Sequence, residues 1–318
     1  MVVVGAAGFI GRACTRALRE AGFEVDGVDV IDDAAEGAAS WTVANVMSDG
    51  VPERLLADCR TLIHFAWAND PGRGNVNMAN DVRTNVACAV QVFEQAARAG
   101  VRRILYPSSG GTIYGHRPPL PTPETAPILP VGGYGAGKAA AEMYLHAIML
   151  AHGTETCALR IGNPYGPGQW PERGQGFIAT AVARTLRGQP IQIFGTASLA
   201  RDYVFIDDVA EAFVLACKCE TIEPVLNLGS GVDYSLEQLI PLIFEAAERR
   251  TEIEYLPGRP VDAPCVRLDI SRIAATLGWR PVTSMEQGLA RTVEWIEKIA
   301  LDQQPRTKTP TTISPAAR

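Results

Sequence analysis

Tyr134 and Lys138 lie four residues apart in the segment "YGAGK", where a predicted helix begins, so their side chains share one face of it. A tyrosine side chain has an ordinary pKa of about 10 and is a poor base at neutral pH. A lysine ammonium close by favours the phenolate form. The spacing therefore predicts that Tyr134 moves a proton and that Lys138 tunes it.

A second group of chemically useful side chains lies in residues 108–115, "SSGGTIYG". Ser108, Ser109 and Thr112 carry hydroxyls that can bind an alcohol or pass on a proton. The segment follows an apolar run and is separated from Tyr134 by a single loop. We therefore expect these hydroxyls to lie beside the tyrosine.

A glycine turn follows the first apolar run "MVVV": Gly5, Gly8 and Gly11 in "GAAGFIG". Such a turn lets the backbone approach a pyrophosphate, whose charge then lies at the N-terminus of the next helix. Asp29 closes the second predicted strand, where a carboxylate accepts hydrogen bonds from ribose hydroxyls and repels a 2′-phosphate. Residues 30–33 offer no arginine to offset that repulsion. The predicted cofactor is therefore NAD rather than NADP.

Short apolar runs alternate with helical patterns through the first half of the chain. Strands are predicted at residues 1–4, 23–30, 61–68, 101–109 and 155–163, and helices at 9–22, 80–100 and 134–153. This alternation is typical of an α/β fold, a Rossmann-like doubly wound parallel sheet. Residues 116–132 contain too many prolines for a helix or a central strand, and we interpret them as a long ordered loop.

Beyond residue 164 the pattern is less regular, with helices predicted at 177–189 and 206–219 and a strand at 191–194. We interpret residues 1–164 as the NAD-binding domain and residues 165–300 mainly as a smaller C-terminal substrate-binding lobe, with some later segments returning to the first domain. Residues 302–318 are polar and contain prolines, so we expect a disordered tail.

Composition excludes several other classes. The formal net charge of −6 does not favour nucleic acid as a partner, and no run approaches the roughly 20 apolar residues of a membrane span. Seven cysteines without paired spacing fit reduced thiols, and hence a cytoplasmic protein. Cys217 and Cys219 have no second Cys or His pair to complete a metal site, so no metal is expected. His64 lies within an apolar strand and is interpreted as a core residue.

The motifs together resemble the extended short-chain dehydrogenase/reductase family, and within it the nucleotide-sugar 4-epimerases of the UDP-hexose type. The resemblance covers about residues 1–298 and rests on "GAAGFIG", "GVDV", "LIHFAWA", "SSGGTIYG", "YGAGK", "RIGNPYGPGQ", "ARDYVFIDDVA", "NLGSG" and "LGWRP". It implies that Tyr134 is the acid/base and that Lys138 also holds the nicotinamide ribose. It further implies a UDP-sugar substrate and a homodimer built through helices near 86–99 and 134–150.

The resemblance also implies which residues contact the ligands. Those expected at the cofactor are Gly5, Gly8, Phe9, Ile10, Gly11, Asp29, Asn45, Val46, Phe65, Ala66, Trp67, Asn85, Ser108, Tyr134 and Lys138. Those expected at the substrate are Ser109, Gly110, Thr112, Tyr134, Asn163, Arg173, Phe177, Arg201, Arg259 and Asp262. Asn163 and Arg201 would contact the diphosphate, and Arg259 and Asp262 the phosphate and the uridine ribose.

Related enzymes differ in the acids of the 108–115 segment. Dehydratases of the family use a Thr-Asp-Glu series there, and uronic-acid decarboxylases carry Glu at the position of Thr112. This chain has Gly111 and Thr112 instead, so removal of a proton from carbon is poorly supported. A 4-epimerase, working through a transient 4-keto sugar, is the favoured reaction. Dehydratase, decarboxylase and reductase activities remain alternatives.

Gly110 departs from the epimerase pattern, which has Ser or Thr at this position bonded to the sugar 4-hydroxyl. Ser109, Thr112 or a water would have to supply that contact, and Thr112 is favoured because it lies on the same alternating face of an extended chain. The sugar, glucose or glucuronate, stays open. Arg173 could meet a uronate carboxylate or have no specific role.

Overall fold

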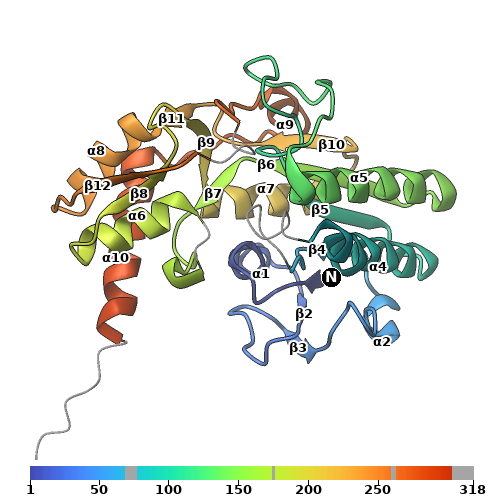
Figure 1. Ribbon diagram of the computed structural model, residues 1–318. Helices are drawn as coiled ribbons and strands as arrows, with labels where there is room; N and C mark the ends of the chain where they lie inside the picture. Colours follow the sequence, from blue (N-terminus) through green and yellow to red (C-terminus); the bar gives the residue numbers. More distant parts are fainter. Residues whose placement is uncertain (69–76, 174–175, 259–262, 303–318) are drawn as a thin grey trace, which may run out of the picture.

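The computed structural model describes residues 1–68, 77–173, 176–258 and 263–302. Its centre is a seven-stranded parallel sheet in the order β10-β6-β5-β4-β1-β2-β3 (Figure 1). These strands are β1 (Val2–Val4), β2 (Asp26–Asp29), β3 (Ser40–Val43), β4 (Thr61–His64), β5 (Arg103–Ser109), β6 (Glu155–Ile161) and β10 (Val225–Leu228). The predicted α/β doubly wound fold is thus confirmed. The strand order reverses between β1 and β4, where ligands of such sheets bind.

Two helical layers cover the sheet and bury both of its faces. They consist of α1 (Phe9–Glu20) with α7 (Ile206–Lys218), and of α4 (Ala87–Arg98) with α5 (Gly132–His152). Alternate strand residues serve the two layers: Val3 and Leu105 pack with the first pair, and Val4 and Ile104 with the second. Burial on both sides explains why these strands appear in the sequence as continuous apolar runs.

A smaller group of elements lies beyond the carboxyl ends of the strands, on the opposite side of the molecule from α4 (Figure 1). Its sheets are β11-β9-β7 and β12-β8, formed by β7 (Asn163–Tyr165), β8 (Ile191–Phe194), β9 (Ala200–Phe205), β11 (Asp233–Ser235) and β12 (Ile253–Leu256). Its helices are α6 (Phe177–Leu186), α8 (Leu236–Ala246) and α10 (Met285–Asp302). β10 returns to the large sheet from this half of the chain. The division near residue 164 remains a prediction.

Two local features were not predicted. The single helix expected at 80–100 is α3 (Met78–Asp81), a π-helical turn at Val82–Val86 and then α4. β3 was not predicted, because its residues are exposed or half-buried and form no apolar run. The Pro-rich residues 116–132 contain no long helix or strand, and Thr122 bridges to Leu268. The remaining short helices are α2 (Glu53–Leu56), α9 (Ser271–Leu277) and a 3₁₀ turn at Pro171–Arg173.

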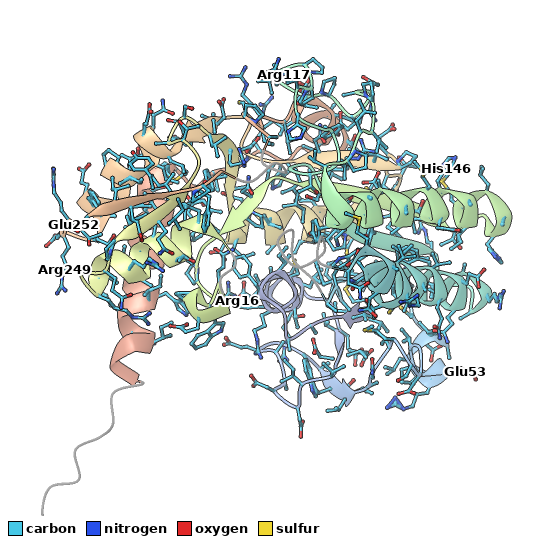
Figure 2. The ribbon with its side chains drawn as sticks, viewed as in Figure 1. Arg16, Glu53, Arg117, His146, Arg249 and Glu252 are labelled. Carbon is cyan, nitrogen blue, oxygen red and sulfur yellow. The ribbon has the colours of Figure 1, made fainter. Side chains whose placement is uncertain are left out.

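Charged side chains point outward over the described surface, as Arg117, Arg249 and Glu252 show (Figure 2). None of the helices described is long and apolar enough to cross a membrane. A smaller set of charged side chains is buried, and because burying a charge is costly, each of them needs a partner or a role. They include Arg103, Lys138, Glu142, Arg160 and Asp202.

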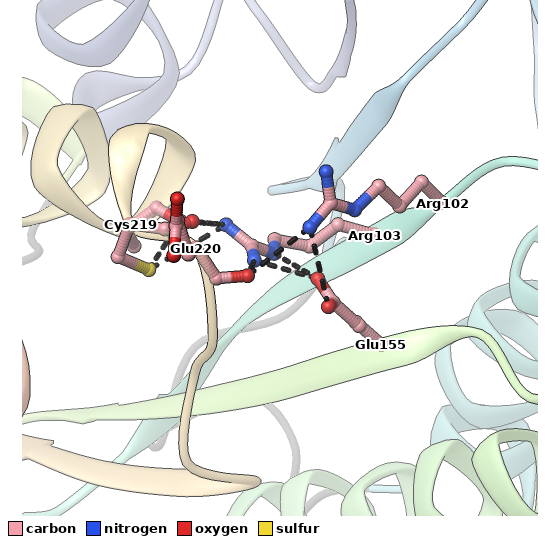
Figure 3. A network of polar contacts seen from close by, with 6 residues as sticks. Arg102, Arg103, Glu155, Cys219 and Glu220 are labelled. Carbon is pink, nitrogen blue, oxygen red and sulfur yellow. Dashed lines mark hydrogen bonds and ion pairs between the residues drawn. The ribbon is translucent and has the colours of Figure 1, made fainter.

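Arg103 fastens the end of α7 to the beginning of β5 (Figure 3). Its guanidinium pairs with Glu155 at 2.6 Å and donates to the carbonyls of Ala216, Cys219 and Glu220 at 2.7–3.0 Å. A cation is favourable at a helix C-terminus, where carbonyls lack partners. Cys219 thus belongs to a structural network, and the described residues bring no three metal-binding side chains together.

Candidate active site

The glycine turn between β1 and α1 cannot accept side chains. Gly5 has a φ of +80°, and a Cβ there would lie 2.5 Å from the Ala66 nitrogen. A Cβ at Gly11 would collide with the Gly5 carbonyl. α1 begins at Phe9 without a side-chain cap, so its first N–H groups can bind an anion. This geometry fits the pyrophosphate of a dinucleotide. Phe9 and Ile10 are half-buried on the first turn.

Asp29, at the end of β2, is anchored to this turn. Its carboxylate accepts hydrogen bonds from the Ala7 N–H at 2.8 Å and the Ile31 N–H at 3.2 Å. The structure adds a residue that the sequence did not suggest: Arg12 reaches this side from α1 and pairs with Asp33 at 2.6 Å. Asp33 neutralises that arginine. The surroundings of Asp29 therefore still favour a ribose hydroxyl over a 2′-phosphate.

Replacing Asp29 with asparagine is expected to weaken NAD binding by about 10- to 100-fold, because a hydrogen bond to a charged group is worth about 1.5–3 kcal/mol. Discrimination against NADP should also decrease, since the repulsive charge is gone. Titration of the cofactor-free protein with each dinucleotide measures both dissociation constants. Equal NAD affinity in the wild type and D29N would contradict the ribose contact.

The next predicted cofactor residues lie at the ends of β4 and β3. Ala68 N–H donates to Asn85 Oδ1 at 2.7 Å, and Asn85 Nδ2 donates to Asp81 at 2.8 Å. The π-helical turn thus ties α4 to the segment containing Phe65, Ala66 and Trp67. Asn45 and Val46 follow β3, the first exposed and the second buried.

Tyr134 and Lys138 lie in the first turns of α5, next to the end of β5. Lys138 is buried, and its Nζ donates to the Pro107 carbonyl at 2.9 Å and lies 4.1 Å from the centre of the Trp67 ring. The Trp67 ring meets the Tyr134 ring edge-on at 6.2 Å. The predicted acid/base pair is thus held together around one indole, as the helical spacing indicated.

Burial lowers the pKa of Lys138 to about 7, although the charges of Glu142 and Asp81 act in the opposite direction. His64 lies in the core against Phe93 and Tyr106, and its pKa is lowered to about 3 by burial and then by Lys138. It is a core residue, as predicted, and stays neutral at physiological pH.

The lowered pKa of Lys138 has a measurable effect on stability. Between pH 7 and about 10.4 the unfolded lysine keeps its proton while the native one loses it, so the unfolded state binds more protons and native stability rises with pH. We expect Lys138→Met to stabilise the cofactor-free protein more at about pH 6 than at about pH 9. Urea unfolding of both proteins across this range tests the effect, and parallel stability curves would contradict it.

The hydroxyl-rich segment begins at the end of β5. Ser108 and Ser109 are buried, and Thr112 Oγ1 donates to Ser109 Oγ at 2.9 Å. Gly135, directly after Tyr134, packs on Thr112, since a Cβ there would lie 2.6 Å from the Thr112 carbonyl oxygen. The structure therefore brings Thr112, Ser109 and the first turn of α5 together.

Tyr114, the phenol of this segment, is bonded to other side chains in the interior of the fold. Its hydroxyl donates to Asn227 Oδ1 at 2.6 Å and accepts from Arg160 at 2.9 Å. Burial raises its pKa to about 12, and the charge of Arg160 opposes this shift. Arg160 in turn pairs with Glu142 at 2.7 Å. Sequence reasoning missed this network, because its members come from four separate segments.

Three of the predicted substrate residues, Asn163, Arg201 and Phe177, lie on β7, β9 and α6. Asn163 and Arg201 stand on the adjacent strands β7 and β9, and Arg201 donates to the Ala200 and Ala263 carbonyls at 2.9 and 2.7 Å. Asn163 Nδ2 is buried without a hydrogen-bond partner among the described residues, which fits a ligand contact. Arg259 and Asp262 lie outside the described residues, as does the side chain of Arg173.

Phe177 opens α6 and lines a cavity of about 240 Å³ in the smaller lobe. The other lining residues are Gly176, Thr180, Ala181, Arg184, Ile191, Gln192 and Phe194. Two phenylalanine rings share its walls with the polar side chains of Thr180, Arg184 and Gln192, and small-molecule sites use such polar groups to orient a ligand. The cavity is therefore a candidate for the part of a substrate remote from Tyr134.

Several known proteins resemble this chain over nearly its whole length. The chain is 34% identical to the UDP-glucose 4-epimerase of Mycolicibacterium smegmatis, over 92% of this chain and 97% of the relative. It is 30% identical to a dTDP-4-dehydro-6-deoxyglucose reductase of Escherichia coli, over 93% and 97%. A solved UDP-glucose 4-epimerase of Thermotoga maritima, with UDP-glucose, superposes with a TM-score of 0.89 at 33% identity, covering 94% of this chain and 99% of the other.

Residues 1–229 match the model of the NAD-dependent epimerase/dehydratase family. This match spans the glycine turn, Asp29, the hydroxyl-rich segment and the Tyr134–Lys138 pair. The cofactor predicted from the first βα turn is the one that defines the family. The chain therefore belongs to the NAD-dependent epimerase/dehydratase family.

Proposed function

We propose that this protein is an NAD-dependent 4-epimerase of a UDP-sugar. The observation that carries the proposal is the Tyr134–Lys138 pair at the carboxyl edge of the sheet, beside a segment that offers hydroxyls and no carboxylate. The two similar 4-epimerases, from Mycolicibacterium and Thermotoga, support the same reaction.

Each side chain has a defined task in this proposal. NAD, held by the glycine turn and Asp29, supplies a hydride acceptor for C4 of the sugar. Tyr134 takes the proton of the 4-hydroxyl during oxidation and returns it during reduction, and Lys138 favours the tyrosinate when charged. Asn163 and Arg201 bind the diphosphate. Ser109 and Thr112 bind the sugar itself.

Dehydration and decarboxylation are less well supported by the described site. Glu142 and Asp81 are the carboxylates whose charges reach Lys138. Glu142 is paired with Arg160 and Asp81 accepts from Asn85, so each has a structural partner. Removal of a proton from carbon needs a positioned base, and the 108–115 segment offers none.

Net reduction of a keto sugar is the second candidate, because the Escherichia coli reductase is 30% identical over nearly the whole chain. The two reactions differ in what happens to the cofactor. An epimerase restores NAD in every turnover, whereas a reductase consumes one reduced cofactor per product.

A panel of UDP-sugars, incubated with the purified protein and followed by NMR, separates these functions. We expect UDP-glucose and UDP-galactose to interconvert without added cofactor and without accumulation of NADH. If UDP-glucuronate is converted to its 4-epimer instead, the protein is still a 4-epimerase, but its substrate is a uronate. A dependence on added NADH, or formation of a deoxy or decarboxylated product, would contradict the epimerase.

The homodimer is proposed on the exposed face of α5. Met143, Tyr144 and Leu150 are 61%, 52% and 72% exposed there, an unusual set of large apolar side chains for one helix. Light scattering of the purified protein is expected to give about twice the mass of one chain.

A further inference from the structure

Gly110 occupies the position where the similar family pattern has a hydroxyl residue, and the structure shows why a side chain is excluded. A Cβ at Gly110 would lie 2.6 Å from Leu268 Cδ1 and 3.0 Å from the Arg160 carbonyl oxygen. Leu268 is 1% exposed and packs with Ile113 and Val266. The leucine therefore fills the volume into which a side chain at 110 would extend.

The backbone of Leu268 is fixed on two sides. Its N–H donates to Asp202 Oδ2 at 3.0 Å, and the residue bridges to Thr122 of the Pro-rich loop. Asp202 is itself buried and also accepts from the Ser230 N–H at 2.6 Å. Because the Leu268 backbone is fixed and its side chain is buried against Ile113 and Val266, the leucine methyl groups have little space to move away from Gly110.

Thr112, in contrast, carries a hydroxyl, and its neighbours hold it in one position. Its Oγ1 donates to Ser109 Oγ. Both groups are hydroxyls that can rotate, so Ser109 can donate to Thr112 instead, and the Thr112 O–H can then donate to a ligand oxygen. Its carbonyl accepts from the Val131 N–H at 3.2 Å, and its Cβ lies against Gly135 in the first turn of α5. The residue is thus held next to the helical turn that carries Tyr134.

We infer that Leu268 is a positioning residue: it keeps a side chain out of position 110, so that the sugar contact falls to Thr112, whose hydroxyl accepts from Ser109 and donates a hydrogen bond to the substrate 4-oxygen. The inference rests on the proposed function and deepens it. The contact moves no proton of its own: the 4-hydroxyl proton goes to Tyr134 on oxidation and returns from it on reduction. A side chain at 110 cannot coexist with the Leu268 Cδ1 methyl group in its present position.

Moving the sugar-binding hydroxyl from Thr112 to position 110 tests this arrangement. In the wild-type background, Thr112→Val should lower kcat by about 10²-fold, the usual effect of losing one hydrogen bond to a reacting oxygen. In a Gly110→Ser/Leu268→Ala background, the contact with the leucine methyl groups is gone, and a small shift of the Arg160 carbonyl lets the introduced serine provide the missing hydroxyl. There, the same Thr112→Val change should lower kcat by less than about 10-fold.

The matched control is Gly110→Ala/Leu268→Ala, which carries the same Cβ without the hydroxyl. Thr112→Val should remain as damaging there as in the wild type. The Gly110→Ser single variant should lose both activity and thermal stability, and adding Leu268→Ala should recover activity. If Thr112→Val is equally harmful with serine and with alanine at 110, or harmless in the wild type, the inference is wrong.

These outcomes can be separated from failure of the proposed function. The variants are compared in the oxidation step alone, through the transient absorbance of enzyme-bound NADH in the first turnover, with whichever nucleotide sugar the wild type oxidises. If the wild type oxidises the sugar without epimerising it, the proposed function is contradicted, but the comparison of the variants at positions 110, 112 and 268 can still be interpreted. Epimerisation without rescue by the introduced serine would contradict only the role of Leu268 and Thr112.

Discussion

Replacing Tyr134 with phenylalanine is expected to lower kcat for UDP-sugar conversion by about 10²–10⁴-fold, the range for loss of a general acid/base. Phenylalanine keeps the ring that meets Trp67 edge-on at 6.2 Å, so the packing around Lys138 should persist. The change removes only the phenolic oxygen. NAD and UDP-sugar should bind within a few-fold of the wild type, because neither the glycine turn nor Arg201 is altered.

Steady-state kinetics with the preferred UDP-sugar measures the effect, and isothermal titration measures the two affinities. Tyr255→Phe is the matched control, because that tyrosine is 60% exposed on β12, outside the proposed site. It should leave kcat unchanged. If Y134F keeps more than about a tenth of the wild-type kcat, another group must take the proton.

The parallel sheet could be predicted from the sequence because each central strand is buried on both faces. Val2, Val3 and Val4 are all buried, and such runs between helical patterns have few other solutions. The glycine turn and the Tyr134–Lys138 spacing are local patterns of the same kind, so the structure places them as expected. β3 escaped prediction because an edge strand with exposed residues carries no apolar signal.

The contacts between distant segments could not be predicted. Nothing near Gly110 in the sequence indicates that Leu268 lies against it, and nothing near Asp29 indicates that Arg12 reaches the same side from α1. These contacts depend on how segments far apart in the sequence pack together, which the local pattern of residues does not reveal. Arg259 and Asp262 remain predictions, since they lie outside the described residues.

The Arg160–Glu142 pair should be the most sensitive point of the fold beneath the hydroxyl-rich segment. The two side chains are 4% and 5% exposed and bond through three contacts of 2.7–3.2 Å. Arg160→Met would leave Glu142 buried without its cation and remove the donor to Tyr114. Breaking such a pair from one side costs about 3–5 kcal/mol, because an uncompensated charge stays in the interior. Urea unfolding at pH 7 measures the change.

The double variant Arg160→Met/Glu142→Met distinguishes the pair from simple packing. Because apolar replacement of both partners of a buried ion pair is often neutral or stabilising, the second change should recover much of the lost stability. Any remaining deficit would report the bond from Arg160 to Tyr114 and, through it, to Asn227. If the double variant is less stable than Arg160→Met alone, the buried charge is not the cause of the loss. In that case the segment would depend on packing around Arg160 rather than on its charge.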